Sequence, residues 1–461
     1  MNPQIFREYD IRGVVGRDFD AADVERIGLA FGTYVRQRGG KRLAVGRDHR
    51  LSSESFCAAL TQGVQATGCD VVDIGLVPTP LLYFSLFQLS VDGGCMITAS
   101  HNPAEYNGIK LCCGQGALYG EEIQEIRRLA EHGPFMAGTA QRTEAEVRSA
   151  YIAYITNQIH LHRPLRVVVD AGNGTSGLII QDLLRQLGCD VYELFCEVDG
   201  TFPNHHPDPT VPANLTDIIR EVRARKADVG LAYDGDSDRL GVIDERGEIL
   251  WGDRLLVLFA REILARQPGA KVIFDVKCSQ VLVDDIRQHG GRPIMWMTGH
   301  SLIKKKLREE QAALAGEMSG HLFFADGYFG YDDAIYASCR LLQILDRAQA
   351  PLSSLLADLP LTYSTPEIRV TCADDDKVGV VEQLTARFQQ ERLVREVITI
   401  DGARILFPDG WGLVRASNTQ PALVLRFEAT TPQGLEAIQT FMMEKLRDFP
   451  SVELTDQPVH E

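Results

Sequence analysis

Three stretches of the chain follow one plan: a short apolar strand that ends in aspartate, a helical segment, and a glycine that leads into a second strand. The first strands are expected at 42–48, 166–170 and 271–275, and the glycines are Gly68, Gly188 and Gly290. Glycine after a helix fits a left-handed cap, because glycine adopts positive φ without strain. Continuous apolar strands separated by helices are typical of βαβ units in mainly parallel sheets. The sequence therefore predicts three related α/β domains.

The C-terminal part of the chain follows a different plan. Strands are expected at 367–371 and 422–427, and helices at 377–391 and 433–447, which indicates a smaller α+β domain. A chain of 461 residues exceeds one hydrophobic core, since domains usually contain roughly 100–150 residues. The expected domains are 1–148, 149–252, 253–366 and 367–461.

The formal net charge of −16 limits the classes of partner. Nucleic acids and anionic membranes require clustered lysine and arginine, so neither is expected. The sequence has no run of about 18 apolar residues that would form a transmembrane helix, and its first residues lack the apolar segment of a signal peptide. Its 10 cysteines form no C-x-x-C pair, which favours reduced thiols and a cytoplasmic protein.

Three carboxylates, Asp234, Asp236 and Asp238, follow an apolar strand expected at 229–233. Side chains two residues apart point to the same side of an extended backbone, so these carboxylates are expected to converge. Converging carboxylates repel one another unless a cation lies between them, and hard oxygen ligands favour Mg²⁺ or Ca²⁺. The segment therefore predicts a metal site.

Three other interpretations of this acidic segment stay open at this point. An EF-hand calcium loop would have glutamate at position 12, which Glu245 satisfies, but glycine at position 6, where this chain has Arg239. An aspartyl-nucleophile phosphotransferase would carry a phosphoryl group on Asp234 or Asp236, but the threonine that usually follows is absent. A solvated acidic turn would need no ligand.

The segment Arg415-Ala-Ser-Asn-Thr419 lies between two expected strands of the C-terminal domain. The guanidinium of Arg415 offers a planar fork for phosphate. Ser417, Asn418 and Thr419 add hydroxyl, amide and backbone N–H donors around a tight turn, which is typical of anion-binding loops. The segment predicts a phosphate-binding loop, and the alternative is an ordinary hairpin with arginine at a strand end.

The segment Gly316-Glu-Met-Ser-Gly-His321 combines an acceptor and a donor two residues apart. Glu317 and Ser319 could hold neighbouring hydroxyls of a sugar, and the flanking glycines let the backbone approach a ligand closely. Taken alone the pattern is weak, because such spacing is common in loops.

The segment Thr98-Ala-Ser-His-Asn-Pro103 follows a short apolar run. Asn102 and Pro103 suit a plain turn, and the Gly-x-Ser-x-Gly elbow of hydrolases is absent. His101 is adjacent to Ser100 in sequence, so we expect it to be poorly placed as a general base but able to orient the loop. A serine beside a metal site would be a natural phosphate carrier. On the serine alone, a turn is the better interpretation.

Taken in their order along the chain, the Ser100, Asp234, Glu317 and Arg415 segments closely resemble the α-D-phosphohexomutase superfamily and, within it, the bacterial phosphomannomutase/phosphoglucomutase group. Two more segments, 6–13 and 107–110, also match, so the resemblance covers nearly the whole chain. It implies three similar mixed-sheet α/β domains and a smaller C-terminal α+β domain around a central cleft. A chain of four domains can enclose its own site, so a monomer is expected.

The resemblance also implies roles for individual residues. Ser100 is expected to be phosphorylated, and Mg²⁺ is expected on a phosphoserine oxygen with Asp234, Asp236 and Asp238. Substrate phosphate would be bound by Arg415, Ser417, Asn418 and Thr419, and sugar hydroxyls by Glu317 and Ser319. The remaining matched positions line the cleft: Tyr9, Arg12, His101, Asn102, Lys110, Arg239, Lys277, His300 and His321. Of these, Lys110 and His321 are the candidates for acid/base work, and Arg12 and His101 join the catalytic group.

The implied reaction moves phosphate between the 1- and 6-hydroxyls of a hexose through a sugar 1,6-bisphosphate, which serves as intermediate and activator. If Glu317 and Ser319 contact only O3 and O4, glucose and mannose phosphates are both accepted, because these sugars differ at C2. Met318 stands where phosphoglucosamine mutases usually carry glutamine. The alternatives are a phosphoglucosamine mutase and a metal-dependent sugar-phosphate binding protein without turnover.

Overall fold

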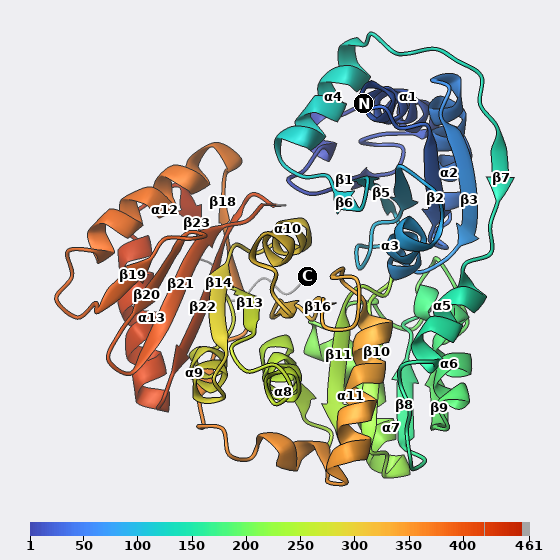
Figure 1. Ribbon diagram of the computed structural model, residues 1–461. Helices are drawn as coiled ribbons and strands as arrows, with labels where there is room; N and C mark the ends of the chain where they lie inside the picture. Colours follow the sequence, from blue (N-terminus) through green and yellow to red (C-terminus); the bar gives the residue numbers. More distant parts are fainter. Residues whose placement is uncertain (419, 454–461) are drawn as a thin grey trace.

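The computed structural model describes residues 1–418 and 420–453 of the chain. These residues form four β-sheets that follow one another in sequence. We call each sheet with its helices a domain, numbered I to IV. Figure 1 shows the domains arranged in sequence order around the middle of the molecule, from the blue N-terminal part to the red C-terminal part.

Domain I contains a seven-stranded sheet. Its strands are β1 (Ile11–Val14), β2 (Arg42–Arg47), β3 (Asp70–Leu76), β4 (Gly93–Ile97), β5 (Tyr106–Cys113), β6 (Gly116–Ala117) and β7 (Arg142–Glu144). Its helices are η1 (Pro3–Ile5), α1 (Ala21–Gln37), α2 (Ser53–Ala66), α3 (Thr79–Gln88) and α4 (Glu121–His132). The strand order is β1-β5-β4-β2-β3-β7, with β6 paired to β5. Parallel and antiparallel pairs both occur, so the sheet is mixed.

Domain II contains a five-stranded sheet in the order β12-β11-β10-β8-β9. Its strands are β8 (Arg166–Asp170), β9 (Asp190–Leu194), β10 (Val229–Tyr233), β11 (Leu240–Asp244) and β12 (Ile249–Leu250). Its helices are α5 (Arg148–Thr156), η2 (Thr175–Leu178), α6 (Ile180–Gln186), η3 (Pro212–Leu215) and α7 (Thr216–Arg225).

Domain III contains a four-stranded sheet in the order β14-β13-β15-β16. Its strands are β13 (Lys271–Asp275), β14 (Arg292–Trp296), β15 (Leu314–Gly316) and β16 (Leu322–Phe324). Its helices are α8 (Gly252–Leu264), α9 (Gln280–Gln288), α10 (His300–Glu310), α11 (Ala334–Ala348) and η4 (Leu352–Leu356).

Domains I to III share one arrangement of four strands. In each, a central strand pairs in parallel with an outer strand and with a third strand, which then turns back into an antiparallel fourth strand. The three series are β3-β2-β4-β5, β9-β8-β10-β11 and β14-β13-β15-β16. The predicted repeat is confirmed, and its glycines Gly68, Gly188 and Gly290 all have positive φ. The hairpin between the third and fourth strands carries the Ser100 segment (Thr98–Pro103) in domain I, the acidic segment in domain II and the Glu317 segment in domain III.

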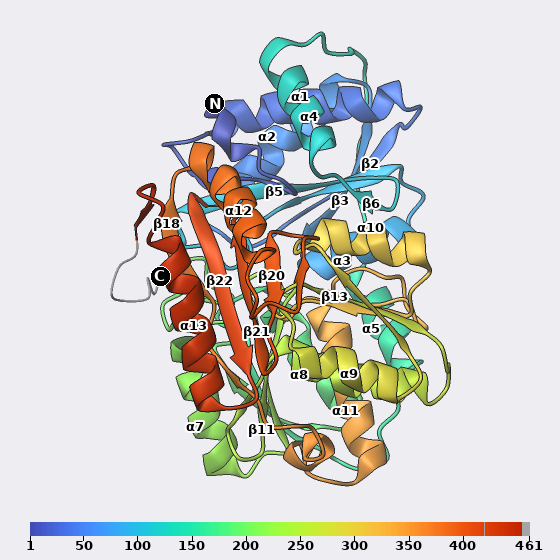
Figure 2. The same ribbon diagram turned by 90° about the vertical axis from the view of Figure 1, so that its left-hand side faces the viewer.

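Domain IV contains an antiparallel sheet of seven strands in the order β19-β20-β21-β22-β18-β23, with β17 paired to β22. Its strands are β17 (Tyr363–Ser364), β18 (Ile368–Cys372), β19 (Glu396–Ile398), β20 (Ala403–Leu406), β21 (Gly410–Ala416), β22 (Ala422–Ala429) and β23 (Val452–Glu453). Its helices, α12 (Asp374–Phe388) and α13 (Pro432–Leu446), cover the outer face of the sheet (Figure 2). The expected α/β and α+β fold class is confirmed.

Domain IV packs on domain III through an apolar cluster and several polar contacts, among them those of the buried Arg404. Trp411 and Leu413 of β21 form a buried cluster with Val276, which follows β13. Arg404 lies 3.8 Å from the Trp411 ring centroid and donates 2.7 Å hydrogen bonds to the carbonyl oxygens of Val276 and Cys278. The junction therefore satisfies backbone acceptors that would otherwise be buried without a partner. Within residues 1–418 and 420–453, no helix has the length and apolarity needed to cross a membrane.

Candidate active site

Ser100 lies in the hairpin between β4 and β5, where only 3 % of the residue is exposed. Its φ is +50°, a conformation that serine adopts only when the surroundings hold it there. The backbone N–H of Ser100 donates to Thr98 Oγ1 (3.0 Å). The turn interpretation is thus correct for the backbone, and the turn directs the Ser100 hydroxyl toward domain II.

Arg50 holds the serine loop by hydrogen bonds to its backbone, a role that the sequence did not reveal. Its guanidinium donates to four backbone carbonyls of the loop and the start of β5: those of Ser100 (2.8 Å), Asn102 (2.5 Å), Pro103 (2.6 Å) and Tyr106 (3.0 Å). Its Nε lies 3.3 Å from Asp48, the aspartate at the end of the first predicted strand. Asp48 and Arg50, two polar residues directly after an apolar strand, were the available sequence signal.

The acidic segment is the hairpin between β10 and β11 in domain II. Asp234, Asp236 and Asp238 are buried, and ligand oxygens of all three lie within 4.8 Å of one another. Burial, together with the charges of Asp238 and Asp236, raises the pKa of Asp234 well above its usual range. Asp236 Oδ1 has no hydrogen-bond partner among the described residues, and Asp238 Oδ1 lies 3.2 Å from His321 Nε2. These oxygens fit a hard cation, and the strands on both sides exclude an EF-hand.

The serine and acidic loops contact each other directly. Ser100 Oγ donates a 2.5 Å hydrogen bond to Asp234 Oδ2. A Cβ on Gly235 would lie 2.4 Å from the carbonyl oxygen of Ser100, so glycine is required for this approach. Thr79, at the start of α3, donates to Asp236 Oδ2 (2.6 Å). Domain I therefore helps to orient an expected metal ligand of domain II, and no feature of the sequence pointed to Thr79.

Lys110 of β5 is close to the same carboxylates. Its Nζ lies 2.8 Å from Asp236 Oδ2 and 2.5 Å from Asp238 Oδ2. Burial disfavours the charge, but Asp236 and Asp238 outweigh burial and raise the pKa of Lys110 above its ordinary value. In this arrangement Lys110 is an ammonium ion that holds its proton tightly.

The His101 ring is closer to the Ser100 hydroxyl than its place in the sequence suggested. Its Nδ1 lies 3.0 Å from Ser100 Oγ, because the positive φ of Ser100 folds the two neighbouring side chains together. Burial and the charges of Arg239 and Arg12 lower the pKa of His101 well below its ordinary value. The expectation that adjacency places His101 poorly is therefore wrong: a neutral imidazole lies within hydrogen-bonding distance of the hydroxyl.

Arg12 and Tyr9 bring the N-terminal segment of domain I to the same region. Arg12 donates to Asn102 Oδ1 (2.5 Å) and is also paired with Asp10. The Tyr9 ring packs edge-on against the His300 ring at a centroid distance of 5.3 Å, and burial raises the pKa of Tyr9 to about 12. The first residues of the chain therefore reach domain III.

The Glu317 segment is the hairpin between β15 and β16 in domain III. Glu317 Oε2 lies 2.8 Å from His321 Nδ1, and His321 Nε2 lies 3.2 Å from Asp238 Oδ1. Burial disfavours the charge of His321, but Asp238 and Glu317 outweigh burial and raise its pKa to about 9. Ser319 Oγ is 3.1 Å from His321 Nδ1. His321 thus bridges the acidic loop and the Glu317 loop as a cation.

Arg239 and His300 complete the contacts between these loops. The backbone N–H of Arg239 donates to Asp234 Oδ1 (3.1 Å), and Arg239 forms an isolated backbone bridge with His321. His300 Nδ1 lies 3.5 Å from Asp332 Oδ2, and Asp332 Oδ1 accepts from Lys304 Nζ (2.7 Å). Lys304 and Asp332 were missed, because neither belongs to one of the recognised segments.

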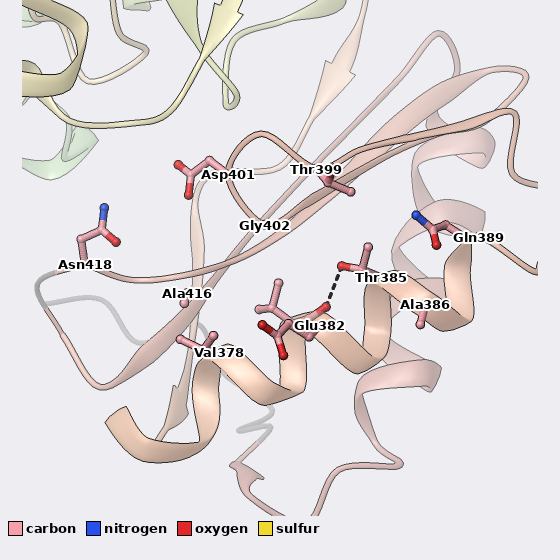
Figure 3. Close-up of a pocket in the computed structure, with 11 residues that line it drawn as sticks. Val378, Glu382, Thr385, Ala386, Gln389, Thr399, Asp401, Gly402, Ala416 and Asn418 are labelled. Atoms are coloured by element: carbon pink, nitrogen blue, oxygen red, sulfur yellow. Dashed lines mark hydrogen bonds between the residues drawn. The ribbon is translucent and has the colours of Figure 1, made fainter. Parts of the chain in front are cut away.

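The Arg415 segment connects β21 and β22. Arg415 Nε donates to Asp401 Oδ2 (2.9 Å). Asn418 lines a cavity of about 430 Å³ between α12 and the 399–402 loop (Figure 3). Ser417 is buried, and its N–H donates to the carbonyl oxygen of Ala422 (2.9 Å). Thr419 lies outside the described residues.

Lys277 lies at the junction of domains III and IV. Its Nζ is 3.1 Å from Glu367 Oε2 and 3.7 Å from Asp275 Oδ2. The Lys277–Glu367 ion pair joins domains III and IV, and Asp401 holds Arg415 within domain IV. These contacts place the candidate phosphate-binding loop beside domain III. Described contacts link the loops of domains I, II and III directly, and the charge of Arg415 in domain IV acts on Tyr9 of domain I.

Comparisons with known proteins agree along the whole chain. Family models of phosphoglucomutase/phosphomannomutase match in order: alpha/beta/alpha domain I at residues 3–136, domain II at 149–247, domain III at 251–363 and the C-terminal domain at 367–445. A phosphomannomutase/phosphoglucomutase of Pseudomonas aeruginosa is 48% identical over 443 residues, covering 96% of this chain and 95% of that protein.

Two further relatives agree with this match. A phosphoglucomutase of Neisseria gonorrhoeae is 46% identical over 438 residues, covering 94% of this chain and 95% of that protein. The crystal structure of a phosphoglucomutase/phosphomannomutase family protein from Burkholderia thailandensis superimposes with a TM-score of 0.92 at 46% identity, covering 97% of this chain and 98% of that one.

Proposed function

The chain belongs to the phosphoglucomutase/phosphomannomutase family and is a phosphohexomutase, and on this premise we propose that it transfers phosphate between O1 and O6 of a hexose through phosphorylated Ser100. The 2.5 Å contact of Ser100 Oγ with Asp234 Oδ2 carries the proposal. This contact puts a hydroxyl at the edge of a carboxylate cluster suited to a metal ion, a combination that suits phosphoryl transfer.

The proposed cycle begins with the phosphoryl group on Ser100. The free hydroxyl of the bound sugar monophosphate attacks this phosphorus, the bond from phosphorus to Ser100 Oγ breaks, and the hydroxyl proton leaves to a base. The resulting sugar 1,6-bisphosphate turns end for end. Ser100 Oγ then loses its proton and attacks the other phosphorus, and the bond from that phosphorus to the sugar oxygen breaks. The sugar oxygen takes up a proton, which leaves the isomeric sugar monophosphate and phosphorylated Ser100. The Arg415 loop, with Ser417, Asn418 and Thr419, would hold the phosphate that is not reacting in each half of the cycle.

The Asp234, Asp236 and Asp238 oxygens and a phosphoserine oxygen would hold Mg²⁺, because all are hard oxygen ligands. When bound, Mg²⁺ would offset the negative charge that develops during transfer. Lys110 would be displaced from Asp236 and Asp238 toward the phosphoryl group, where its ammonium could donate a proton to Ser100 Oγ. At the sugar hydroxyl, the protonated His321 is the candidate acid and the neutral His101 is the candidate base.

Glu317 and Ser319 would bind O3 and O4 of the sugar, and Tyr9, Arg12, Asn102, Arg239, Lys277 and His300 would surround it. O3 and O4 have the same configuration in glucose and mannose, so both sugar phosphates are proposed substrates. The proposed enzyme acts as a monomer in the cytoplasm. Its ten free cysteines support the cytoplasmic location, because thiols stay reduced there.

The test is a panel of sugar 1-phosphates incubated with enzyme, Mg²⁺ and a trace of glucose 1,6-bisphosphate, with 6-phosphates followed by phosphorus NMR. Glucose and mannose 1-phosphates should be converted and glucosamine 1-phosphate converted poorly. A clear preference for glucosamine 1-phosphate would identify a phosphoglucosamine mutase instead. Binding without conversion of any sugar would identify a binding protein.

A further inference from the structure

Asp401 accepts one hydrogen bond from the candidate phosphate-binding loop and another from Thr298, a neighbour of the Glu317 loop. It lies in the turn between β19 and β20, and its side chain is 9% exposed. A single oxygen, Oδ2, accepts two N–H groups: Arg415 Nε at 2.9 Å and the backbone N–H of Thr298 at 3.0 Å. The first donor belongs to domain IV and the second to domain III. In Figure 3 the Asp401 carboxylate points away from α12, at the end of the domain IV cavity.

The contact with Arg415 orients a guanidinium that still has donors to offer. Arg415 is 5% exposed, and its Nη2 has no hydrogen-bond partner among the described residues. A carboxylate on Nε holds the plane of the group while leaving an Nη donor for a second anion. Gly402 permits this closeness: its φ is +76°, and a Cβ there would lie 2.6 Å from Arg415 Cβ.

The contact with Thr298 leads to the Glu317 loop. Thr298 Oγ1 donates to Asp275 Oδ2 (3.2 Å), and Asp275 Oδ1 accepts the backbone N–H of Met318 (3.2 Å). The next residue, Gly299, donates its N–H to Glu317 Oε1 (2.6 Å). Two short chains of hydrogen bonds thus run from the Asp401 contact to the backbone and the side chain of the loop proposed to bind sugar hydroxyls.

We propose that Asp401 is a positioning residue that fixes Arg415 relative to the Glu317 loop, so that the phosphate and the hydroxyls of one hexose phosphate are bound at a set spacing. The inference rests on the proposed function of Arg415 and Glu317. A pyranose ring is rigid and cannot adjust to a different spacing. A change in the distance between the two loops therefore lowers the affinity for the hexose phosphate and misaligns the reacting hydroxyl.

The first test measures binding without turnover, in the Ser100→Ala background. The dissociation constant of glucose 1-phosphate is measured by calorimetry for that parent and with Asp401→Ala, Asp401→Asn or Glu382→Ala added. Asp401→Ala should weaken binding by about 10- to 100-fold, the usual effect of losing a charge-assisted hydrogen bond. Asp401→Asn keeps an acceptor for Thr298 and should lose less. Glu382 is an exposed carboxylate on the same cavity, so its variant should bind like the parent.

A double-mutant cycle with Arg415→Ala separates positioning from general destabilisation. If Asp401 acts through Arg415, adding Asp401→Ala to Arg415→Ala should change the dissociation constant by less than about twofold. The same fold-change in both backgrounds would overturn the proposal, as would parent-like binding by Asp401→Ala. Should Asp401→Ala fail to fold, Asp401→Asn carries the same cycle. If the wild type is active and the Asp401 variants bind like the parent, this inference alone is refuted. If the wild type binds the sugar phosphate but is inactive, the proposed function alone is refuted.

Discussion

Ser100 Oγ and Asp234 Oδ2 are joined by a 2.5 Å hydrogen bond across 134 residues of sequence. The two residues occupy equivalent hairpins of successive repeats, after β4 in domain I and after β10 in domain II. A phosphoryl group on Ser100 would therefore extend into the carboxylate cluster.

Replacement of Ser100 by alanine should remove the phosphate-bearing group. We expect turnover to fall by about 10³-fold or more and the intact mass to lose one phosphoryl group, because no other nucleophile is proposed. Mass spectrometry and the mutase assay check this, with Ser55→Ala as an exposed control. If Ser100→Ala kept a phosphate that hydroxylamine released, an aspartyl phosphate would be the carrier instead.

Removal of divalent metal should abolish activity and lower thermal stability. Chelation leaves three buried carboxylates close together, and Mg²⁺ should raise the melting temperature by binding the folded state alone. In Asp238→Asn this Mg²⁺-dependent shift should shrink, whereas Asp182→Asn, at an exposed aspartate, should keep it. An equal shift in Asp238→Asn and wild type would mean that the ion binds elsewhere.

Gly235→Ala should push the acidic loop away from the serine loop. The added Cβ would meet the carbonyl oxygen of Ser100 at 2.4 Å, a backbone contact that no side-chain rotation relieves. We expect a loss of about 1–3 kcal/mol in the free energy of unfolding, together with a clear loss of turnover. Denaturant unfolding and the mutase assay measure the two effects.

The matched control for Gly235→Ala is Gly379→Ala in α12, where nothing lies within 4 Å of the added Cβ. That change should stabilise by about 0.5–1 kcal/mol through helix propensity. Similar unfolding free energies and activities for the two variants would contradict the proposed tight approach of the loops.

The buried carboxyl of Asp333 should make stability depend on pH. Burial raises the pKa of Asp333 from 3.8 to about 7, although Tyr151 Oη, Tyr328 Oη and the N–H of Tyr336 donate to it. The folded state then binds this proton more tightly than the unfolded state, so the stabilisation is complete below about pH 4 and is lost as pH rises toward 7.

Asp333→Asn removes that titration. Relative to wild type, the variant should gain up to about 4 kcal/mol between pH 4 and pH 8 in the free energy of unfolding. Urea unfolding at several pH values measures the difference. Parallel pH profiles for the two proteins would show that Asp333 titrates alike in the folded and unfolded states.

The repeat pattern predicted strands well because its signals are local. The strands expected at 166–170 and 271–275 are β8 and β13, and the glycines after the helices adopt positive φ. The Ser100, Asp234 and Glu317 segments could also be found from the sequence, since each is a cluster of polar residues after an apolar strand. Their equivalence as hairpins of three repeats emerged only from strand pairing.

Residues that act through another residue escaped the sequence analysis. Arg50, Thr79 and Asp401 each hold a recognised loop from outside that loop, by hydrogen bonds. A single threonine between ordinary neighbours, such as Thr79, carries no local signal. Such partners depend on which backbone atoms the fold leaves in need of a donor.

The sequence by itself determined the elements, the repeat and the chemical character of the loops, because apolar periodicity, glycine caps and clustered polar residues act over a few positions. Tertiary structure alone decided which loops meet. Ser100 and Asp234 come into contact because two mixed sheets set their hairpins against each other, with Gly235 leaving room for the approach. His101 turns toward Ser100 because the packed loop holds a positive φ that serine would not adopt in isolation.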